Sequence, residues 1–137
     1  MPDPLSRHTD TIVALMTPPG KSAVALIRLS GPEAHRIAAS VFDGIPVEPE
    51  WRHAYYGSFI HGDDGLVTLF ADGRSYTGEP VAELSTHGSM VSVRGLIEAC
   101  LAQGARQAEP GEFTMRAWMN GEMDLAQAEG VREVIES

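Results

Sequence analysis

The sequence predicts an α+β domain in which a mixed β-sheet of about five strands packs against about three helices. Runs of β-branched and aliphatic residues, which are typical of strands, are mixed with segments whose apolar residues recur at helical spacing. The two kinds of segment do not alternate strictly, as they would in a parallel α/β fold. Apolar residues form 43% of the 137 residues, which is enough for the core of one domain.

The first two predicted strands are residues 11–17 and 23–30, joined by Pro18-Pro19-Gly20-Lys21 as a hairpin or a tight connection. Their nearly continuous apolar character favours burial on both faces of the sheet. Ser30 or Gly31 is expected to cap a helix that continues to about residue 42. The inward face of this helix is predicted to consist of Ala34, Ile37, Ala38 and Val41.

The middle of the chain is expected to contain a β-hairpin, a further strand and a helix. Residues 54–61 and 66–71 are predicted as the two strands of the hairpin, with the turn at 62–65. Residues 81–86 form the next predicted strand, and a helix is expected over 89–103. Its apolar face is predicted to consist of Val91, Leu96, Ile97, Cys100 and Leu101. Because Cys100 lies in an apolar setting, we expect a buried and unreactive thiol.

The last part of the chain predicts two short helices after an extended piece at residues 106–108. Pro110 suits the first turn of a helix over 111–119, which Asn120-Gly121 ends. Asp124 and Gln127 form a capping box for a final helix. Its apolar stripe comprises Leu125, Ala128, Val131, Val134 and Ile135. Since the stripe reaches the end of the sequence, we expect the chain to be a fragment of something larger.

Composition and motifs exclude several classes of function. A formal net charge of −9 argues against this segment clamping a nucleic-acid backbone by itself. No apolar run approaches the roughly 20 residues of a spanning helix, and the N-terminus lacks the pattern of a signal peptide, so a cytoplasmic protein without a membrane association is expected. Gly20-Lys21-Ser22 resembles the end of a P-loop, but Leu15 stands where a P-loop needs its first glycine, and two prolines precede Gly20; a nucleotide-binding P-loop is therefore not expected. The spacing of the histidines does not resemble that of a metal site.

Two charged residues in apolar strands are the candidate site residues. Glu83 follows Val81 and Ala82, and its carboxylate either lies on the wet face or accepts hydrogen bonds from paired N–H donors, such as a pterin or purine edge offers. Arg28 lies in the apolar run 23–29, where an arginine is usually paired or functional. A purely structural ion pair between Arg28 and Glu83 is the alternative.

Seven separated motifs resemble the start of the MnmE/TrmE family of bacterial tRNA-modification GTPases, in family order from Asp10 onward. They are Asp10-Thr11-Ile12-Val13-Ala14, Thr17-Pro18-Pro19-Gly20, Ile27-Arg28-Leu29-Ser30-Gly31, Tyr76-Thr77-Gly78-Glu79, Glu83-Leu84 with His87-Gly88, Pro110-Gly111-Glu112-Phe113, and Met123-Asp124-Leu125-Ala126-Gln127-Ala128-Glu129.

The resemblance implies a folate-binding domain at residues 10–119 that also forms a homodimer, similar to the tetrahydrofolate-binding domain of the glycine cleavage T-protein. Residues 122–137 would then be the first helix of a truncated central helical domain. The implied cofactor is 5-formyltetrahydrofolate or a related reduced folate, the one-carbon donor for modifying the wobble uridine of tRNA at carbon 5. GTP, Mg and K would belong only to a GTPase domain absent from this chain, and MnmG, a flavoprotein, would be the partner of the whole protein. The chain alone is expected to be inactive.

The family's folate contacts carry over onto Arg28, Glu83 and Glu122. Glu122 departs from the family, which usually has a lysine there, so either folate binds weakly or another cation, such as Lys21 or Arg116, replaces it. The alternatives are a structural dimerisation module that has lost folate and a free-standing one-carbon transferase, for which no catalytic acid is identified.

Overall fold

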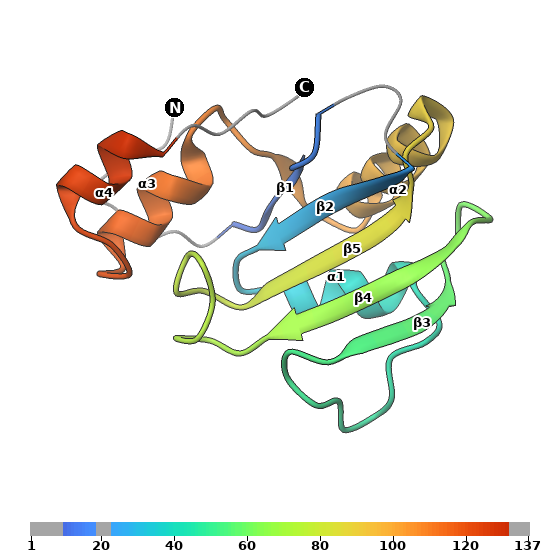
Figure 1. The fold of residues 1–137 in the computed structure, drawn as a ribbon. Helices are drawn as coiled ribbons and strands as arrows, with labels where there is room; N and C mark the ends of the chain where they lie inside the picture. Colours follow the sequence, from blue (N-terminus) through green and yellow to red (C-terminus); the bar gives the residue numbers. More distant parts are fainter. Residues whose placement is uncertain (1–9, 19–22, 132–137) are drawn as a thin grey trace.

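The computed structural model describes residues 10–18 and 23–131, and it confirms the α+β prediction (Figure 1). The strands are β1 (Ile12–Leu15), β2 (Val24–Ser30), β3 (Ala54–Ser58), β4 (Asp64–Phe70), β5 (Val81–His87) and β6 (Arg106–Gln107). The helices are α1 (Ala34–Val41), α2 (Met90–Ala102), α3 (Glu112–Met119) and α4 (Leu125–Gly130). No helix among these residues is long and apolar enough to cross a membrane.

The six strands form one mixed sheet in the order β3-β4-β5-β2-β1-β6. All neighbouring strands are antiparallel except β1 and β6, which are parallel. The sixth strand is the extended piece expected at 106–108, which pairs with β1 and so becomes the edge of the sheet. Arg28 of β2 is the register partner of Glu83 of β5, so the two candidate residues are cross-strand neighbours.

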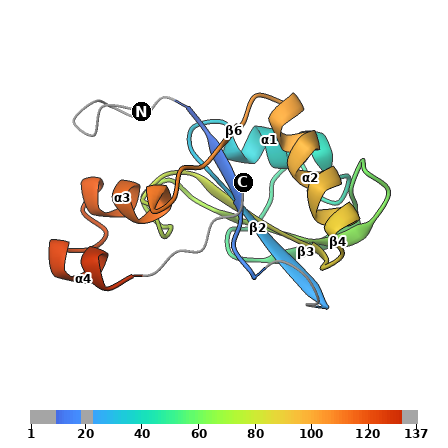
Figure 2. The same ribbon diagram turned by 90° about the horizontal axis from the view of Figure 1, so that it is seen from above.

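The main core lies between one face of the sheet and helices α1 and α2, whereas α3 and α4 lie apart at one end (Figure 2). The four residues predicted to face inward from α1 are all buried. A second, smaller cluster joins Ile12 and Ala14 of β1 to Phe113 of α3. Strand β1 is therefore buried on both faces, as predicted. Strand β2 is not, because only alternate residues face the main core and Arg28 lies on the other face.

Helix α1 begins later than predicted, at Ala34, and neither Ser30 nor Gly31 caps it. The backbone N–H of Glu33 donates instead to the hydroxyl of Thr11, at 2.9 Å. Gly31 makes the turn between β2 and α1 with φ +139°, and a Cβ there would lie 2.6 Å from the carbonyl oxygen of Asp10. The cap thus comes from the chain entering β1, which no local pattern reveals.

Some predicted details of the other elements need correction, and some predicted residues lie outside the described part of the chain. Val91 is 84% exposed, and Val93 takes its place in the buried face of α2. Strand β3 ends at Ser58 instead of residue 61, because Phe59 turns away to bridge Phe42. The capping box of α4 is present, but none of the residues in this helix is buried. Val134 and Ile135 of the predicted stripe, like Lys21 in the predicted turn, fall outside the described residues.

Candidate functional site

The candidate site is built around the ion pair of Arg28 and Glu83 on the sheet face opposite the main core. The Nη2 and Nε atoms of Arg28 donate to the same oxygen, Oε2 of Glu83, at 3.0 and 3.2 Å. The side chains are 14% and 25% exposed, respectively, so the pair is partly shielded but open to solvent. Since Arg28 uses only one oxygen, Oε1 of Glu83 is not occupied by the guanidinium.

Strand alternation explains why these two charges meet. Ile27 and Leu29 of β2 and Ala82 and Leu84 of β5 point into the main core, so the residues between them point to the opposite face. The register of the two strands then places Arg28 directly beside Glu83. A cross-strand pair of opposite charge stabilises a sheet by about 0.2–1 kcal/mol. This geometry agrees with the predicted pairing and with either of its interpretations, structural or ligand-binding.

Two aromatic rings from outside the sheet flank Arg28, and together they form what we call the aromatic wall. The guanidinium carbon lies 4.8 Å from the ring centroid of Tyr76 and 5.5 Å from that of Phe113. These distances suit cation–π contacts, which orient the guanidinium as well as stabilise it. Tyr76 belongs to the loop between β4 and β5, and Phe113 belongs to α3, so three segments that are distant in sequence meet here.

The third predicted residue, Glu122, lies apart from this pair. Its side chain is exposed and rests against the same loop, because a Cβ added at Gly78 would lie 3.0 Å from Oε1 of Glu122. Within the described part of the chain, Glu122 forms no hydrogen bond or ion pair with Arg28 or Glu83.

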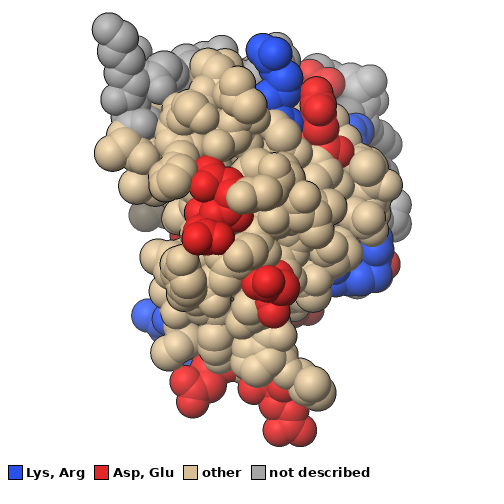
Figure 3. Space-filling view, turned by 90° about the vertical axis from the view of Figure 1, so that its right-hand side faces the viewer, with Lys and Arg blue, Asp and Glu red and all other residues tan. Residues whose placement is uncertain are grey.

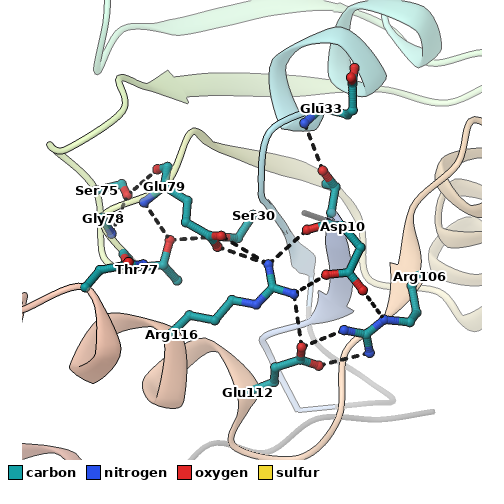
Figure 4. Close-up of polar contacts among 12 residues, drawn as sticks. Asp10, Ser30, Glu33, Ser75, Thr77, Gly78, Glu79, Arg106, Glu112 and Arg116 are labelled. Carbon is teal, nitrogen blue, oxygen red and sulfur yellow. Dashed lines mark hydrogen bonds and ion pairs between the residues drawn. The ribbon is translucent and has the colours of Figure 1, made fainter. Parts of the chain in front are cut away.

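A buried charge network next to the pair was not predicted. It consists of Asp10, Glu79, Arg106, Glu112 and Arg116 (Figure 4). At its centre the guanidinium of Arg116 is 0% exposed. It donates to Asp10 Oδ1 at 2.7 Å, to Glu112 Oε2 at 3.1 Å and to both oxygens of Glu79 at 3.2 Å. Arg106 binds Glu112 at 2.6 Å and Asp10 at 2.8 Å.

Arg116 is therefore not available to replace the family lysine, which was one of the alternatives that the sequence left open. Its guanidinium is enclosed and committed to three carboxylates. The one sequence signal for the network was the i, i+4 spacing of Glu112 and Arg116 on a predicted helix. The other partners, Asp10 and Glu79, lie 106 and 37 residues from Arg116 in the chain, so no local pattern connects them.

The arginines favour the ionised forms of Asp10 and Glu112. Burial is the largest single influence on the pKa of Glu112, and it raises that pKa. Hydrogen bonds from Arg106 and from the backbone of Glu109, together with the charges of both arginines, outweigh burial and lower the pKa overall. The same balance lowers the pKa of Asp10. Hydrogen bonds to Glu112 and Asp10 in turn raise the pKa of Arg106. Asp10, Glu112 and Arg106 therefore keep their charges near neutral pH, which suits a structural role.

The described residues contain no group of three or more histidine, cysteine or acidic side chains placed to hold a metal ion. Cys100 is buried, and burial raises the pKa of its thiol to about 12. The arrangement most suited to chemistry is therefore the Arg28–Glu83 pair. A fixed carboxylate beside aromatic rings can accept paired N–H donors from a flat heterocycle.

Comparison with known proteins assigns the chain to a family. The model of the GTP-binding protein TrmE N-terminus matches residues 11–122. A tRNA modification GTPase MnmE of Pseudomonas paraeruginosa is 47% identical over 94% of this chain and 29% of its own length. The protein of the same name from Cytophaga hutchinsonii is 46% identical over 97% of this chain and 30% of its own length. The one from Chloroflexus aurantiacus is 47% identical over 92% of this chain and 29% of its own length.

The chain thus spans about three-tenths of the length of these relatives, and its matched region contains the pair, the aromatic wall and all of the buried charge network except Asp10. It belongs to the family of TrmE N-terminal domains, the N-terminal part of the tRNA modification GTPases named MnmE.

Proposed function

We propose that this chain is the folate-binding and dimerisation domain of a tRNA-modifying GTPase, and that it binds 5-formyltetrahydrofolate or a related reduced folate at the Arg28–Glu83 pair. The single observation that carries the proposal is this pair, set beneath the aromatic wall on the open face of the sheet. Residues 10–119 form the proposed folate domain, and residues from 122 onward begin a following helical domain.

The chemistry of a reduced pterin matches the groups at the site. Its 2-amino group and neighbouring ring N–H are paired donors in one plane, and a carboxylate accepts such a pair through its two oxygens. Arg28 holds one oxygen of Glu83 and so fixes the plane in which the carboxylate presents itself. Of the two rings of the aromatic wall, Tyr76 is partly exposed and contributes flat surface beside the pair, whereas Phe113 is fully buried and supports Arg28. A flat surface favours a ring system over an aliphatic ligand.

The activity of the whole protein is a further part of the proposal. The relatives are named tRNA modification GTPases, and the chain covers only about three-tenths of them. We assign GTP hydrolysis, with its Mg and K, to a domain outside this chain, and modification of the wobble uridine to the whole protein with MnmG and tRNA in the cytoplasm. This domain would supply the folate and join two subunits.

Titration calorimetry with 5-formyltetrahydrofolate tests the binding role. The wild-type chain is expected to bind, and Glu83→Gln is expected to weaken binding at least roughly tenfold, because an amide offers only one acceptor oxygen where the carboxylate offers two. Glu33→Gln is the matched control, since Glu33 also pairs with an arginine but at an exposed site on the other side of β2. Equal affinity of Glu83→Gln and wild type would place the ligand elsewhere.

The second candidate, a dimerisation module that has lost folate, is favoured by two observations. Arg28 and Glu83 already form an ion pair with each other, and Glu122 stands where the family usually has a lysine, next to the Gly78 loop. Glu122→Lys separates the two candidates. A dimer by solution mass that binds folate only after this substitution supports the lost site, and wild-type binding refutes it.

A further inference from the structure

We infer that Arg116 is the positioning residue of the candidate site: its buried guanidinium fixes the aromatic wall over the Arg28–Glu83 pair. The role of this wall in binding a folate rests on the proposed function, but the positioning itself does not. Arg116 touches neither Arg28 nor Glu83, so it acts through Tyr76 and Phe113.

The aromatic wall does not belong to the sheet and needs its own support. Phe113 is carried by α3, and Tyr76 by the loop between β4 and β5. The two segments are joined directly by the hydroxyl of Tyr76 and that of Thr114, at 2.9 Å, and by Asn120, whose amide donates to the carbonyl of Thr77 at 2.8 Å. These bonds tie the loop to the helix. Each segment also has a polar contact with the sheet, since the hydroxyls of Thr77 and Ser30 share a hydrogen bond at 2.7 Å and Arg106 of β6 binds Glu112 of α3 at 2.6 Å.

Arg116 adds a connection that brings the helix, the loop and the sheet together at one guanidinium (Figure 4). It projects from α3 and binds Glu79 at the end of the loop, while Glu79 also accepts a hydrogen bond from Ser30 at the end of β2, at 2.8 Å. The same guanidinium binds the carbonyl and the carboxylate of Asp10, which precedes β1. One side chain therefore joins the helix, the loop and two strands.

Charge makes this connection hard to replace. In the network, three carboxylates meet two guanidinium groups, and loss of Arg116 would leave the three acids with Arg106 alone. Buried carboxylates without a counter-charge repel one another and seek water. Because Glu79 and Glu112 are on opposite sides of Arg116, we expect this repulsion to separate the loop from α3, and hence Tyr76 from Phe113 and Arg28.

The test uses 3-fluorotyrosine, whose ¹⁹F resonance reports the surroundings of each of the three tyrosines. A Tyr76→Phe sample assigns the signal of Tyr76. Arg116→Met is expected to shift that signal toward its solvent-exposed position and to weaken 5-formyltetrahydrofolate binding roughly tenfold, through loss of the aromatic contacts. Arg36→Met is the matched control, because Arg36 forms an exposed pair with Glu33. It is expected to change neither measurement.

A second variant shows whether charge is the cause. Arg116→Met combined with Glu79→Gln leaves two carboxylates with Arg106. The network then has one more acid than it has arginines, as in the wild type. We therefore expect partial recovery of both the Tyr76 signal and the affinity. Unchanged Tyr76 signal and affinity in Arg116→Met would overturn the inference, as would the absence of any recovery in the double variant.

Two further outcomes keep the inference separate from the proposed function. If Arg116→Met fails to fold, Glu79→Gln alone decides by the same measurements: a displaced Tyr76 signal supports the inference, and a wild-type signal refutes it. If the wild type binds no folate, the proposed function fails, and the Tyr76 resonance alone decides whether Arg116 sets the wall.

Discussion

Arg28 and Arg116 differ in what they leave available to a ligand. Arg28 meets one carboxylate and two ring faces, and one carboxylate oxygen beside it is not taken up by the guanidinium. Arg116 meets three carboxylates and is fully enclosed. A partly shielded pair can exchange solvent for a ligand at modest cost, whereas an enclosed one loses all its partners at once when it opens. We therefore propose a binding role for the first and a supporting role for the second.

Cys100 carries the sharpest prediction at the residue scale. Burial raises the pKa of its thiol to about 12, so near pH 8 the folded protein should contain roughly a thousandfold less thiolate than an ordinary cysteine with a pKa near 9. Labelling by a maleimide should therefore be slow in the native protein and fast in denaturant. Fast labelling under native conditions would show that the thiol is reached without unfolding.

The raised pKa of Cys100 also has a consequence for stability. The unfolded chain loses this thiol proton near pH 9 while the folded chain keeps it to about 12, so the contribution of the protonated thiol is complete below pH 9 and falls as the pH rises above it.

At the residue scale, the sequence indicated the buried thiol and the Arg28–Glu83 pair because both depend on one element or on two neighbouring strands. An arginine inside an apolar run is usually paired or functional, and Glu83 in the predicted strand 81–86 was a candidate partner. Two of the three carboxylate partners of Arg116 come from other segments, and only the tertiary fold brings Asp10 and Glu79 to it.

At the element scale, the turn between β2 and α1 depends on Gly31. Its φ of +139° is a conformation that residues with a Cβ rarely adopt, and the added atom would lie 2.6 Å from the carbonyl of Asp10. Gly31→Ala should lower the free energy of unfolding by at least about 2 kcal/mol in urea titrations. Gly73→Ala is the control, since φ there is +79° but no atom lies within 4 Å, and we expect a cost nearer 1 kcal/mol. Equal losses would mean that contact with Asp10 is unimportant.

Helix α2 shows how far periodicity predicts a buried face. The sequence placed both Val91 and Leu96 on it, yet Val91 is 84% exposed and Leu96 is fully buried. Val93, Leu96 and Cys100 follow the i, i+3, i+7 spacing of one face, and Val91 lies about 200° around the helix from Val93. Apolar character alone could not choose between these two valines, because the sheet under the helix selects the face.

This assignment predicts unequal costs for two similar truncations. Leu96→Ala should lower the free energy of unfolding by about 2–5 kcal/mol, because it leaves a cavity in the main core. Val91→Ala should stay within about 0.5 kcal/mol of the wild type, because the side chain is in solvent. Urea titrations of the two variants measure both values, and a large loss for Val91→Ala would contradict the observed face.

At the scale of the whole molecule, charge is distributed unevenly between the surface and the network. On the face shown in Figure 3, acidic side chains lie in several separate groups and basic ones lie toward its edges, in line with a net charge of −9. Composition predicted that surplus but gave no sign that Arg106 and Arg116, two of only ten basic residues, are held in a partly buried network. Because both guanidinium groups are committed to carboxylates, they add little to the cations available at the surface, which strengthens the argument against binding a nucleic-acid backbone through this segment.

The same network predicts how the protein responds to acid. Because the folded state lowers the pKa of Asp10 and Glu112, the stability they contribute is complete above their unfolded pKa values near 3.8 and 4.5. It is lost as the pH falls through the lower pKa values of the folded state.

Glu112→Gln should reduce the free energy of unfolding at pH 7, where the missing charge leaves Arg106 and Arg116 short of a partner. The wild-type and Glu112→Gln values should then converge toward pH 3, because protonation removes the same charge from the wild type. Glu33→Gln, which changes an exposed pair, is the control and should show no such convergence. Urea titrations between pH 7 and 3 measure the difference, and a gap for Glu112→Gln that stays constant over this range would mean that the ionisation of Glu112 does not support the fold.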